Sequence, residues 1–437
     1  MQQPQQHDSV GLGQHDPQTR RLGHHDVLII GGGLVGASLA IALDRLGLDV
    51  GLVEASPAGA LPAVFDERNL SFAEATTNAL AALGVLQKLR EPTGAIRRIH
   101  VSRVGDFGRV KLDASDHGRE SFGQVVVARD FGEALEARLC ELRGLTRYRP
   151  ARFIGFATGF VDANDGASND GLRAIRIADA EGERTLSARL VVAADGTRSG
   201  VRAALAIGAD EHDYGQTLFV ARVRAERNPD GIAYERFGDD GPTALLPRGD
   251  RHYGVVHGVA REAADAVAAL DEAAWLARLQ QAFGWRVGRF LASGPRSAYP
   301  ATRVVAQCTT AARAVLVGNA AQTLHPIGAQ GFNLGLRDAL TLAELIEADW
   351  KTTGRADPGS ATLLDAYVQR RREDRERTLA FSDGLAKLTA NQAPLLRPLR
   401  GLGLMMFDQS PSMQALLVGG ALGYRGEVPR LCRGDAA

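Results

Sequence analysis

The sequence has few cysteines, no excess of either charge and no long hydrophobic run. Its three cysteines, Cys140, Cys308 and Cys432, are far apart and odd in number, so we predict a reducing compartment and neither disulfides nor a cysteine metal site. Lys plus Arg and Asp plus Glu both number 51, which leaves no net charge to attract nucleic acid. Because no apolar stretch reaches about 18 residues, no transmembrane helix is expected. The length of 437 residues favours two or three globular domains.

The first 24 residues are rich in Gln, His, Asp and Gly, and we expect a disordered tail over 1–24. They contain no apolar run for a secretory signal, and their acidic residues argue against a transit peptide. The histidines have no regular spacing and no acidic or thiolate partner, so no metal is predicted. We therefore expect a cytoplasmic protein. Peripheral contact with a bacterial inner membrane stays open, because residues 385–424 are apolar but interrupted.

Residues 26–53 have the pattern strand, glycine-rich turn, helix, strand. This pattern predicts a Rossmann dinucleotide-binding unit, in which glycines permit a tight turn, close approach of a pyrophosphate and packing of helix on strand. Glu54 ends the second strand, where a carboxylate accepts hydrogen bonds from an adenosine ribose. The fingerprint glycines are Gly31, Gly33 and Gly36.

A second motif, D-G-x-x-S-x-x-R, follows a buried strand and begins at Asp195 and Gly196. An acid followed by glycine is typical of a turn, and Ser199 can cap the helix that follows. Taken alone, the motif fits a plain strand-to-helix junction as well as a cofactor contact.

A third motif occupies 315–338. Gly318 lets the backbone approach a polyol or phosphate, and Asn319 offers amide donors and an acceptor. Further glycines, Gly328 and Gly331 among them, bracket a helix start near Asn333. The helix N-terminus would stabilise the negative charge of a reduced flavin by about 0.3–1 kcal/mol.

These three motifs, in this order, resemble the class A FAD-dependent aromatic hydroxylases over residues 26–425. Shorter segments resemble the ubiquinone-biosynthesis branch, most closely the 2-polyprenyl-6-methoxyphenol hydroxylases. Those segments are Phe65–Arg68, Glu235–Phe237, Ala282–Gly288, Arg296–Pro300, Gly318–Pro326 and Gln369–Arg372. The chain departs from the wider superfamily at two points: Asn319 follows Gly318 in place of Asp, and Ala329-Gln330-Gly331 replaces Gly-Gln-Gly.

Pattern and resemblance together predict an α/β protein with a discontinuous Rossmann-type FAD-binding domain, an inserted and mainly antiparallel β-sheet substrate domain, and a C-terminal helical region. Three antiparallel strands are expected over 232–237, 243–248 and 252–259, separated by hairpin-type turns. The predicted boundaries are 25–100, 187–210 and 300–345 for the FAD-binding domain, 101–186 and 211–299 for the substrate domain, and 346–437 for the helical region.

The resemblance implies noncovalent FAD, reduction by NAD(P)H, and a flavin C4a-hydroperoxide that hydroxylates a polyprenylated phenol with O2 in ubiquinone biosynthesis. Other proteins of that pathway are implied as partners. The implied flavin-ring loop contains His325, Pro326 and Gly328, although a packed or capping role for His325 stays open. No general base is identified. The alternatives are a flavin prenyl reductase or halogenase of the same fold, or a flavin-bearing subunit without turnover.

Two arginines and five large side chains complete the candidate site. Arg68 would reach the pyrophosphate or a nicotinamide phosphate, with a surface ion pair as the alternative. Arg129 would reach the adenosine half, or be an ordinary surface residue. The apolar substrate wall would draw on large side chains, each of which, taken alone, is more often plain core. They are Tyr234, Phe237, Leu246, Trp285 and Tyr299.

Three local predictions concern helices. Capping pairs predict helix starts at Ser71 and Asp130, each with a glutamate three residues later. Residues 365–377 carry arginines among acids at helical spacing and predict an exposed, salt-bridged helix. The apolar residues 385–424 are better explained by a packed helical layer than by membrane contact.

Overall fold

A parallel sheet forms the upper part of the molecule in the computed structural model, which describes residues 23–62, 66–157, 171–325, 327–353, 357–390 and 397–434. The order is β18-β19-β11-β1-β2-β8, and the antiparallel strands β9 and β10 extend it beside β11. The strands β19, β11, β1, β2 and β8 are mutually parallel. Their bounds are β1 His24–Ile30, β2 Val50–Val53, β8 Leu145–Tyr148, β9 Ala151–Phe156, β10 Arg173–Asp179, β11 Gly182–Ala193, β18 Thr310–Ala311 and β19 Ala314–Leu316.

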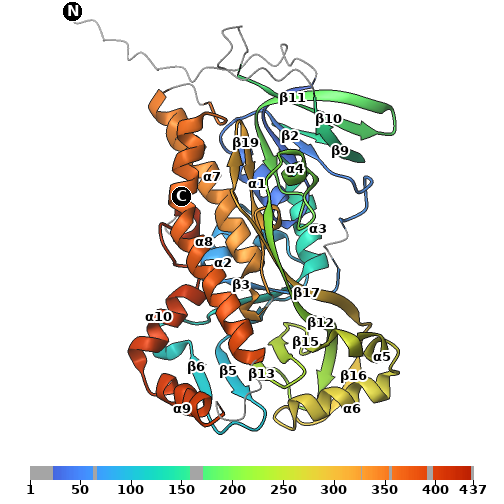
Figure 1. Cartoon of the computed structure of the whole chain (residues 1–437), viewed down its shortest axis with the longest axis vertical. Helices are drawn as coiled ribbons and strands as arrows, with labels where there is room; N and C mark the ends of the chain where they lie inside the picture. The colour runs from blue at the N-terminus through green and yellow to red at the C-terminus, as the bar shows by residue number, and fades with distance from the viewer. Residues whose placement is uncertain are drawn as a thin grey trace, which may run out of the picture.

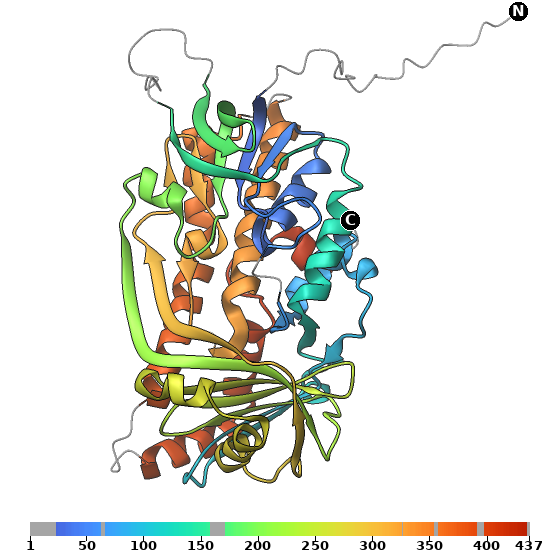
Figure 2. The ribbon, with the colours of Figure 1, turned by 90° about the vertical axis from the view of Figure 1, so that its right-hand side faces the viewer.

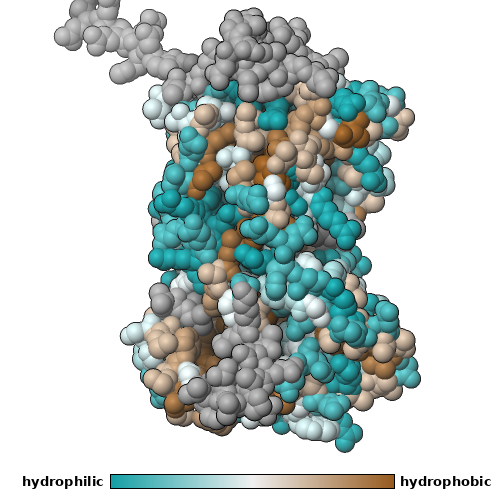
Figure 3. Space-filling model, in the orientation of Figure 1, coloured by the Kyte–Doolittle hydropathy of each residue, from teal (hydrophilic) through white to brown (hydrophobic). Residues whose placement is uncertain are grey.

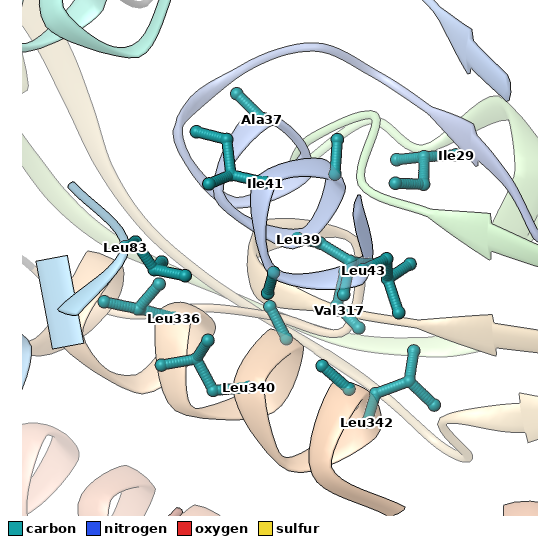
Figure 4. Close-up of a cluster of buried hydrophobic side chains, with 14 of the residues drawn as sticks. Ile29, Ala37, Leu39, Ile41, Leu43, Leu83, Val317, Leu336, Leu340 and Leu342 are labelled. Atoms are coloured by element: carbon teal, nitrogen blue, oxygen red, sulfur yellow. The ribbon is translucent and has the colours of Figure 1, made fainter. Parts of the chain in front are cut away.

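Helices cover this sheet and explain its uninterrupted apolar strands, because a parallel sheet is buried on both faces. Helix α1 (Leu34–Asp44) packs against α7 (Gln330–Thr353), as Figure 4 shows for Leu39, Leu43 and Leu340. Each such fully buried leucine contributes about 1.5–3 kcal/mol. The other helices described are α2 Glu74–Ala82, α3 Ala128–Leu139, α4 Gly200–Ala204, α5 Ala264–Ala268, α6 Glu272–Phe283, α8 Ala361–Ala390, α9 Arg397–Asp408 and α10 Pro411–Ala421.

A nine-stranded sheet forms the lower part, in the order β20-β17-β12-β15-β14-β13-β5-β6, with β16 beside β12. The pairs β13–β14 and β14–β15 are antiparallel, which confirms the predicted three-stranded unit. Helix α6 covers one face with Trp275, Leu279 and Phe283. The bounds are β5 Arg98–Arg103, β6 Arg109–Asp113, β12 Ala209–Ala225, β13 Ile232–Phe237, β14 Pro242–Pro247, β15 Tyr253–Ala260, β16 Phe290–Ser293, β17 Ser297–Ala306 and β20 Gln322–Thr323.

The two parts are joined by long elements. Strands β12 and β17 descend from the upper part and bend into the lower sheet, and α7 and α8 run along one side (Figures 1 and 2). A small antiparallel sheet lies between them, with strands β3 Asn69–Ala73, β7 Gly123–Val127 and β4 Gly94–Ala95. Short 3-10 turns complete the chain: η2 Leu86–Lys88, η3 Ser115–His117, η4 Arg261–Ala263, η5 Gly318–Ala320, η6 Ile327–Ala329 and η8 Arg430–Cys432.

The α/β architecture agrees with the predicted fold class, whereas sheet membership differs within 101–186. Strands β8, β9 and β10 lie in the sheet that contains β1, because β8 pairs in parallel with β2 and β10 pairs with β11. The predicted boundaries instead assign these residues to the substrate domain. The predicted boundary of the tail at residue 24 is too late, since His24 begins β1, and residues 1–22 lie outside the described residues. The remaining domain boundaries stay predictions.

Both predicted helix starts are wrong. Ser71 lies in β3, and α2 begins at Glu74 without a side-chain cap. Helix α3 begins at Ala128, so Asp130 lies inside its first turn. The Asp130 carboxylate instead accepts hydrogen bonds from the backbone N–H groups of Arg90 and Glu91, at 3.1 and 3.2 Å. Asp130 thus satisfies a neighbouring segment rather than its own helix.

The helix over 365–377 is not exposed all round, because one face of α8 is buried against α7. Arg371 and Asp374 on α8 are 3% and 0% exposed, and they pair with Asp338 and Arg337 of α7. The Arg337–Asp374 and Arg371–Asp338 distances are 2.6 and 2.8 Å. Only the opposite face, with Arg372 among its residues, is solvated as predicted.

The C-terminal helices α9 and α10 leave several large apolar side chains in solvent. Figure 3 shows hydrophobic residues at the lower left of this face, where these helices lie. Throughout the part of the chain that is described, no helix combines the length and hydrophobicity needed to cross a bilayer. The large apolar side chains that α9 and α10 expose are those of Leu402, Met405, Met406 and Met413.

Candidate functional site

One cavity of about 830 Å³ brings the three motifs together. Its lining includes Gly31 and Gly33 of the fingerprint, Asp195 and Gly196 of the second motif, and the third-motif residues Asn319, Gly328 and Gly331. Its volume lies within the range of about 300–1,000 Å³ that is typical of ligand sites. The cavity continues from the carboxyl ends of the parallel strands to the nine-stranded sheet.

The fingerprint turn needs glycine at two of its positions. Gly31 has φ +104°, and a Cβ atom there would lie 2.5 Å from the carbonyl oxygen of Ala194. A Cβ atom at Gly36 would overlap the Gly31 carbonyl, so Gly36 permits the close packing of α1 on β1 without lining the cavity. The turn therefore has the close backbone approach that a pyrophosphate site requires.

Glu54 lines the cavity with its carboxylate held in place by the backbone. Its Oε2 accepts from the N–H of Gly32 at 2.8 Å, and its Oε1 accepts from the N–H of Ser56 at 2.7 Å. Each oxygen keeps capacity for a further hydrogen bond. This orientation suits an acceptor for ribose hydroxyls.

Arg68 lines the cavity and also makes the predicted alternative ion pair. Its Nε and Nη2 donate to the two oxygens of Asp66, each at 2.8 Å. Its guanidinium lies 4.3 Å from the ring centre of Tyr299, whose hydroxyl donates to Asp66. Burial would raise the pKa of Asp66, but the hydrogen bonds from Arg68 and Tyr299 and the charge of Arg68 together outweigh it, so the pKa is lowered. Arg129 is exposed, pairs with Glu67 at 2.8 Å and does not line the cavity.

The second motif serves as a helix junction and also faces the cavity. Ser199 caps α4 by accepting from the N–H of Arg202 at 2.9 Å, as the plain alternative predicted. Arg202 donates to the carbonyl oxygen of Ala320 at 2.9 Å, which ties this motif to the third. Asp195 accepts from the N–H of Val201 through Oδ2, whereas its buried Oδ1 has no hydrogen-bond partner among the described residues.

The third motif is packed onto the fingerprint helix. Cβ atoms built at Gly318 or Gly335 would each lie 2.9 Å from a methyl group of Val35 on α1, so glycine at both positions permits this contact. The N–H of Gly318 donates to Asp338 at 3.3 Å, which connects the turn to the buried charges of α7 and α8. Asn319 follows, exposed and lining the cavity, whereas Gly318 itself does not line it.

His325 lines the cavity but is a packed histidine. It is 2% exposed, its Nδ1 accepts from the N–H of Ile327 at 3.2 Å, and the ring of Tyr214 meets it edge-on at 4.7 Å. Burial lowers the pKa of His325 to about 4, so the ring is neutral near pH 7. Its neighbour Pro326 lies outside the described residues.

The loop after His325 holds an unusual backbone conformation. Gly328 has φ +74°, and Ala329 has φ +51° at the point where the wider superfamily has glycine. A left-handed conformation costs a residue with a Cβ atom roughly 1–2 kcal/mol. Asn333 does not line the cavity; its amide donates to the carbonyl oxygens of Ser71 and Ala329, and its oxygen accepts from the N–H of Ala73. Asn333 thus holds the loop.

Of the five predicted wall residues, Tyr234 and Leu246 line the cavity and three do not. Trp285 is 66% exposed beyond the end of α6, and Phe237 packs on Ile327 in a separate core cluster. Tyr299 lies beneath Arg68 instead. The ring of Tyr234 packs edge-on against Phe283 at 5.4 Å, so the side chain points mainly away from the cavity.

The side chains that do face the cavity alternate along the strands, as a pleated sheet requires. On β13 they are Ala233 and Glu235, and on the neighbouring β14 they are Ala244 and Leu246. The predicted wall omits Glu235, although this residue falls inside one of the segments that carry the family resemblance. The signal that identifies Glu235 is its position two residues after Ala233, because residues at this spacing in a strand share one face. Burial raises the pKa of its carboxyl to about 7.

Comparisons with known proteins identify the family. A family model described as an FAD binding domain matches residues 24–382. Ubiquinone hydroxylase UbiL of Rhodospirillum rubrum is 34% identical over 415 residues, which are 94% of this chain and 92% of that protein. The 3-demethoxyubiquinol 3-hydroxylase of Escherichia coli is 28% identical over 405 residues, 91% of this chain and 98% of that protein.

A solved structure shows the same fold. The p-nitrophenol 4-monooxygenase PnpA from Pseudomonas putida superposes with a TM-score of 0.73 at 18% identity, covering 93% of this chain and 100% of that chain. At this identity the likeness concerns the fold alone. Family match and relatives together confirm the resemblance: the chain belongs to the FAD-dependent aromatic hydroxylases, in the branch of the ubiquinone hydroxylases.

Proposed function

We propose that this protein hydroxylates a polyprenylated phenol in ubiquinone biosynthesis, with FAD as cofactor, NAD(P)H as reductant and O2 as oxidant. The observation that carries the proposal is the single cavity, which runs from three flavin-type motifs to an apolar sheet face. The names of the relatives UbiL and 3-demethoxyubiquinol 3-hydroxylase support the substrate class. The 2-polyprenyl-6-methoxyphenol ring is the substrate that we favour.

The residues of the cavity fit FAD. The unpartnered Oδ1 of Asp195 is a buried acceptor in need of a donor, and a ribityl hydroxyl would supply one. Gly31 and Gly33 would lie against the pyrophosphate, Glu54 would accept from the ribose, and Asn319 would bind the ribityl or phosphate part. Helix α7, which begins at Gln330, would direct its positive end to the flavin ring.

When bound, FAD supplies electron transfer from NAD(P)H and the activation of O2. The chain's own part is to orient the ring, exclude water and manage the proton of the phenol. Ala244, Leu246 and Val256 supply an apolar surface for that purpose. His325 brings no charge to the cavity at pH 7, and Arg68, which also lines the cavity, is a suitable contact for a nicotinamide phosphate.

The proposed location is the cytoplasm, with peripheral contact at the inner membrane where a prenylated substrate is held. The exposed side chains Leu402, Met405, Met406 and Met413 on α9 and α10 supply an apolar surface for such contact or for another protein of the pathway. Binding of the purified protein to vesicles, compared with a variant carrying Ser in place of Met405 and Met406, tests this part separately.

The main test combines turnover with product analysis. The purified, FAD-loaded protein is given NAD(P)H, O2 and prenylated phenols, and we expect faster NAD(P)H oxidation together with a product heavier by one oxygen atom. A yellow protein that oxidises NAD(P)H no faster with any prenylphenol would support a flavin-bearing subunit without turnover. Deleting the gene in its host and identifying the accumulated precursor by mass would define the ring position.

A further inference from the structure

The sheet face of the cavity is apolar around one acidic residue. Glu235 lies on β13 between Val101 of β5 and Ala244 of β14, which are its register partners. Neither neighbour offers a hydrogen-bond donor from its side chain. Because successive side chains of a strand point to opposite faces, Arg236 next to it cannot serve as its partner on this face.

The Glu235 carboxyl makes no hydrogen bond and no ion pair with any residue that the structure describes. The residue is partly exposed and lines the cavity. Burial alone accounts for its raised pKa, and no charged neighbour contributes. The other ionisable groups that line the same cavity are Glu54, Arg68, Arg152, Asp195, Tyr234 and His325.

Glu235 is partly buried among apolar side chains, where a polar group without a partner is costly, so an acid in this position requires an explanation. The acids at the flavin end differ, since backbone N–H groups hold both oxygens of Glu54 and one of Asp195. The missing donor at Glu235 would come from a ligand that enters the apolar end of the cavity. A phenolic hydroxyl is such a donor, attached to an apolar ring.

We propose that Glu235 binds the phenolic hydroxyl of the substrate and accepts its proton. This inference rests on the proposed function. The O–H bond of the phenol breaks, the proton moves to a carboxylate oxygen of Glu235, and the electron pair stays on the phenolic oxygen. The ring is then electron-rich enough to take one oxygen atom of O2, whose other atom is reduced to water with the two electrons of NAD(P)H. After oxygen transfer, the carbon that received the oxygen loses its hydrogen as a proton, and the carboxyl returns its own proton to the product oxygen.

The chemistry of the two groups suits this role. A free phenol ionises near pH ~10, well above the range in which most enzymes work, so a base beside it is needed. The pKa of Glu235, raised to about 7 by burial, gives a carboxylate that is partly ionised near neutral pH and is a stronger base than an exposed glutamate. Small residues on either side, Ala233 and Ala244, leave room for a ring next to it.

A binding experiment tests the proposal without turnover. The FAD-loaded, full-length protein is titrated with 2-geranylphenol and with its methyl ether, without NAD(P)H, and the change in oxidised flavin absorbance reports binding. At about pH 8 we expect the phenol to bind about tenfold or more tightly than the ether, because only the phenol donates to a carboxylate. At about pH 6 the preference should shrink, since a protonated carboxyl donates to either oxygen.

Glu235→Gln keeps the shape and removes the base. We expect this variant to lose the pH dependence of the preference and to hydroxylate about 10²–10⁴-fold more slowly at pH 7, with the rate rising toward the ionisation of the phenol itself. Glu235→Asp should restore part of the pH-dependent preference. The matched control is Asp240→Asn on the exposed hairpin after β13, which should behave like the parent protein.

An unchanged preference and pH profile in Glu235→Gln would overturn the inference, and so would equal binding of phenol and ether by the parent protein. If the parent hydroxylates a prenylphenol while Glu235→Gln binds like the parent, the inference fails and the proposed function stands. If the parent hydroxylates none of the phenols offered, the proposed function fails. Flavin content and thermal unfolding of each variant show whether its fold is intact.

Discussion

The acidic residues at the two ends of the cavity differ in their hydrogen bonding. At the flavin end, backbone N–H groups hold both oxygens of Glu54 and one oxygen of Asp195. At the sheet end, Glu235 stands in an apolar wall and has no partner among the described residues. A carboxylate fixed in advance suits a cofactor that stays bound. One that lacks a partner suits a ligand that arrives, reacts and leaves.

The largest expected effect comes from a substitution that disrupts only the flavin end of the cavity. Gly33→Glu would put a carboxylate where the pyrophosphate is expected, and we expect complete loss of bound FAD with the fold retained. Flavin absorbance of the purified protein measures the loss, and circular dichroism measures the fold. Gly384→Glu is the control, because this exposed glycine of α8 has no neighbouring atom within 4 Å of a built Cβ. A yellow Gly33→Glu protein would contradict the cofactor assignment.

The next prediction concerns the buried ion pairs between α7 and α8, to which the turn at Gly318 is connected through Asp338. Arg371→Met removes the cation that pairs with Asp338 and Asp374, and it leaves buried carboxylates uncompensated. We expect a loss of about 3–5 kcal/mol in the free energy of unfolding. Chemical denaturation measures it, and Arg372→Met on the solvated face should change it by at most about 0.5 kcal/mol. Equal effects of the two variants would show that the buried network adds nothing.

At the sheet end, Glu235 should make stability depend on pH. Its folded pKa of about 7 lies above the value near 4.5 of an ordinary glutamate, so the folded protein holds this proton more tightly than the unfolded chain does. The parent should therefore lose stability relative to Glu235→Gln as pH rises from about 4.5 to about 7. The measurement is the melting temperature of both proteins, freed of substrate, across that range. A constant difference between them would contradict the shift.

The smallest effect concerns the loop between the two ends. Ala329→Gly should relieve the left-handed strain at φ +51° and raise the free energy of unfolding by about 1 kcal/mol. Flavin content should not change. The control is Ala361→Gly at the start of α8, where glycine should be neutral or destabilising. A less stable Ala329→Gly variant would mean that the loop conformation is not strained.

Much of the flavin end could be predicted from the sequence because its signals are local. A glycine fingerprint, the acid at the end of the second strand and a strand followed by D-G each define a turn through a few adjacent residues. The contact between Gly318 and Val35 joins residues that are far apart in the sequence, so no local pattern predicts it. Only the resemblance to a known family indicated that their two motifs belong to one site. The role of Ser199 as a helix cap could also be predicted, because capping depends on a few neighbouring residues.

The sheet end and the C-terminal helices were harder to predict. Side-chain size favoured Trp285 and Phe237 as wall residues, and both lie elsewhere, whereas strand alternation would have favoured Ala233 and Glu235. The charged face of α8 became core only because α7 brings complementary charges to it. The local spacing of charges along one helix does not show whether another helix supplies opposite charges to pair with them.

Strands β12 and β17 have a mechanical consequence for access to the cavity. Ala306 at the end of β17 belongs to the core beneath the parallel sheet, while Phe219 of β12 belongs to the core under α6. The two strands are paired along their length, with one register shift between Asp213 and Thr217. Because both strands run from one part to the other, pulling the upper and lower parts straight apart would strain this shared ladder. We therefore expect a long, apolar molecule to enter and leave through small displacements rather than through wide separation of the two parts.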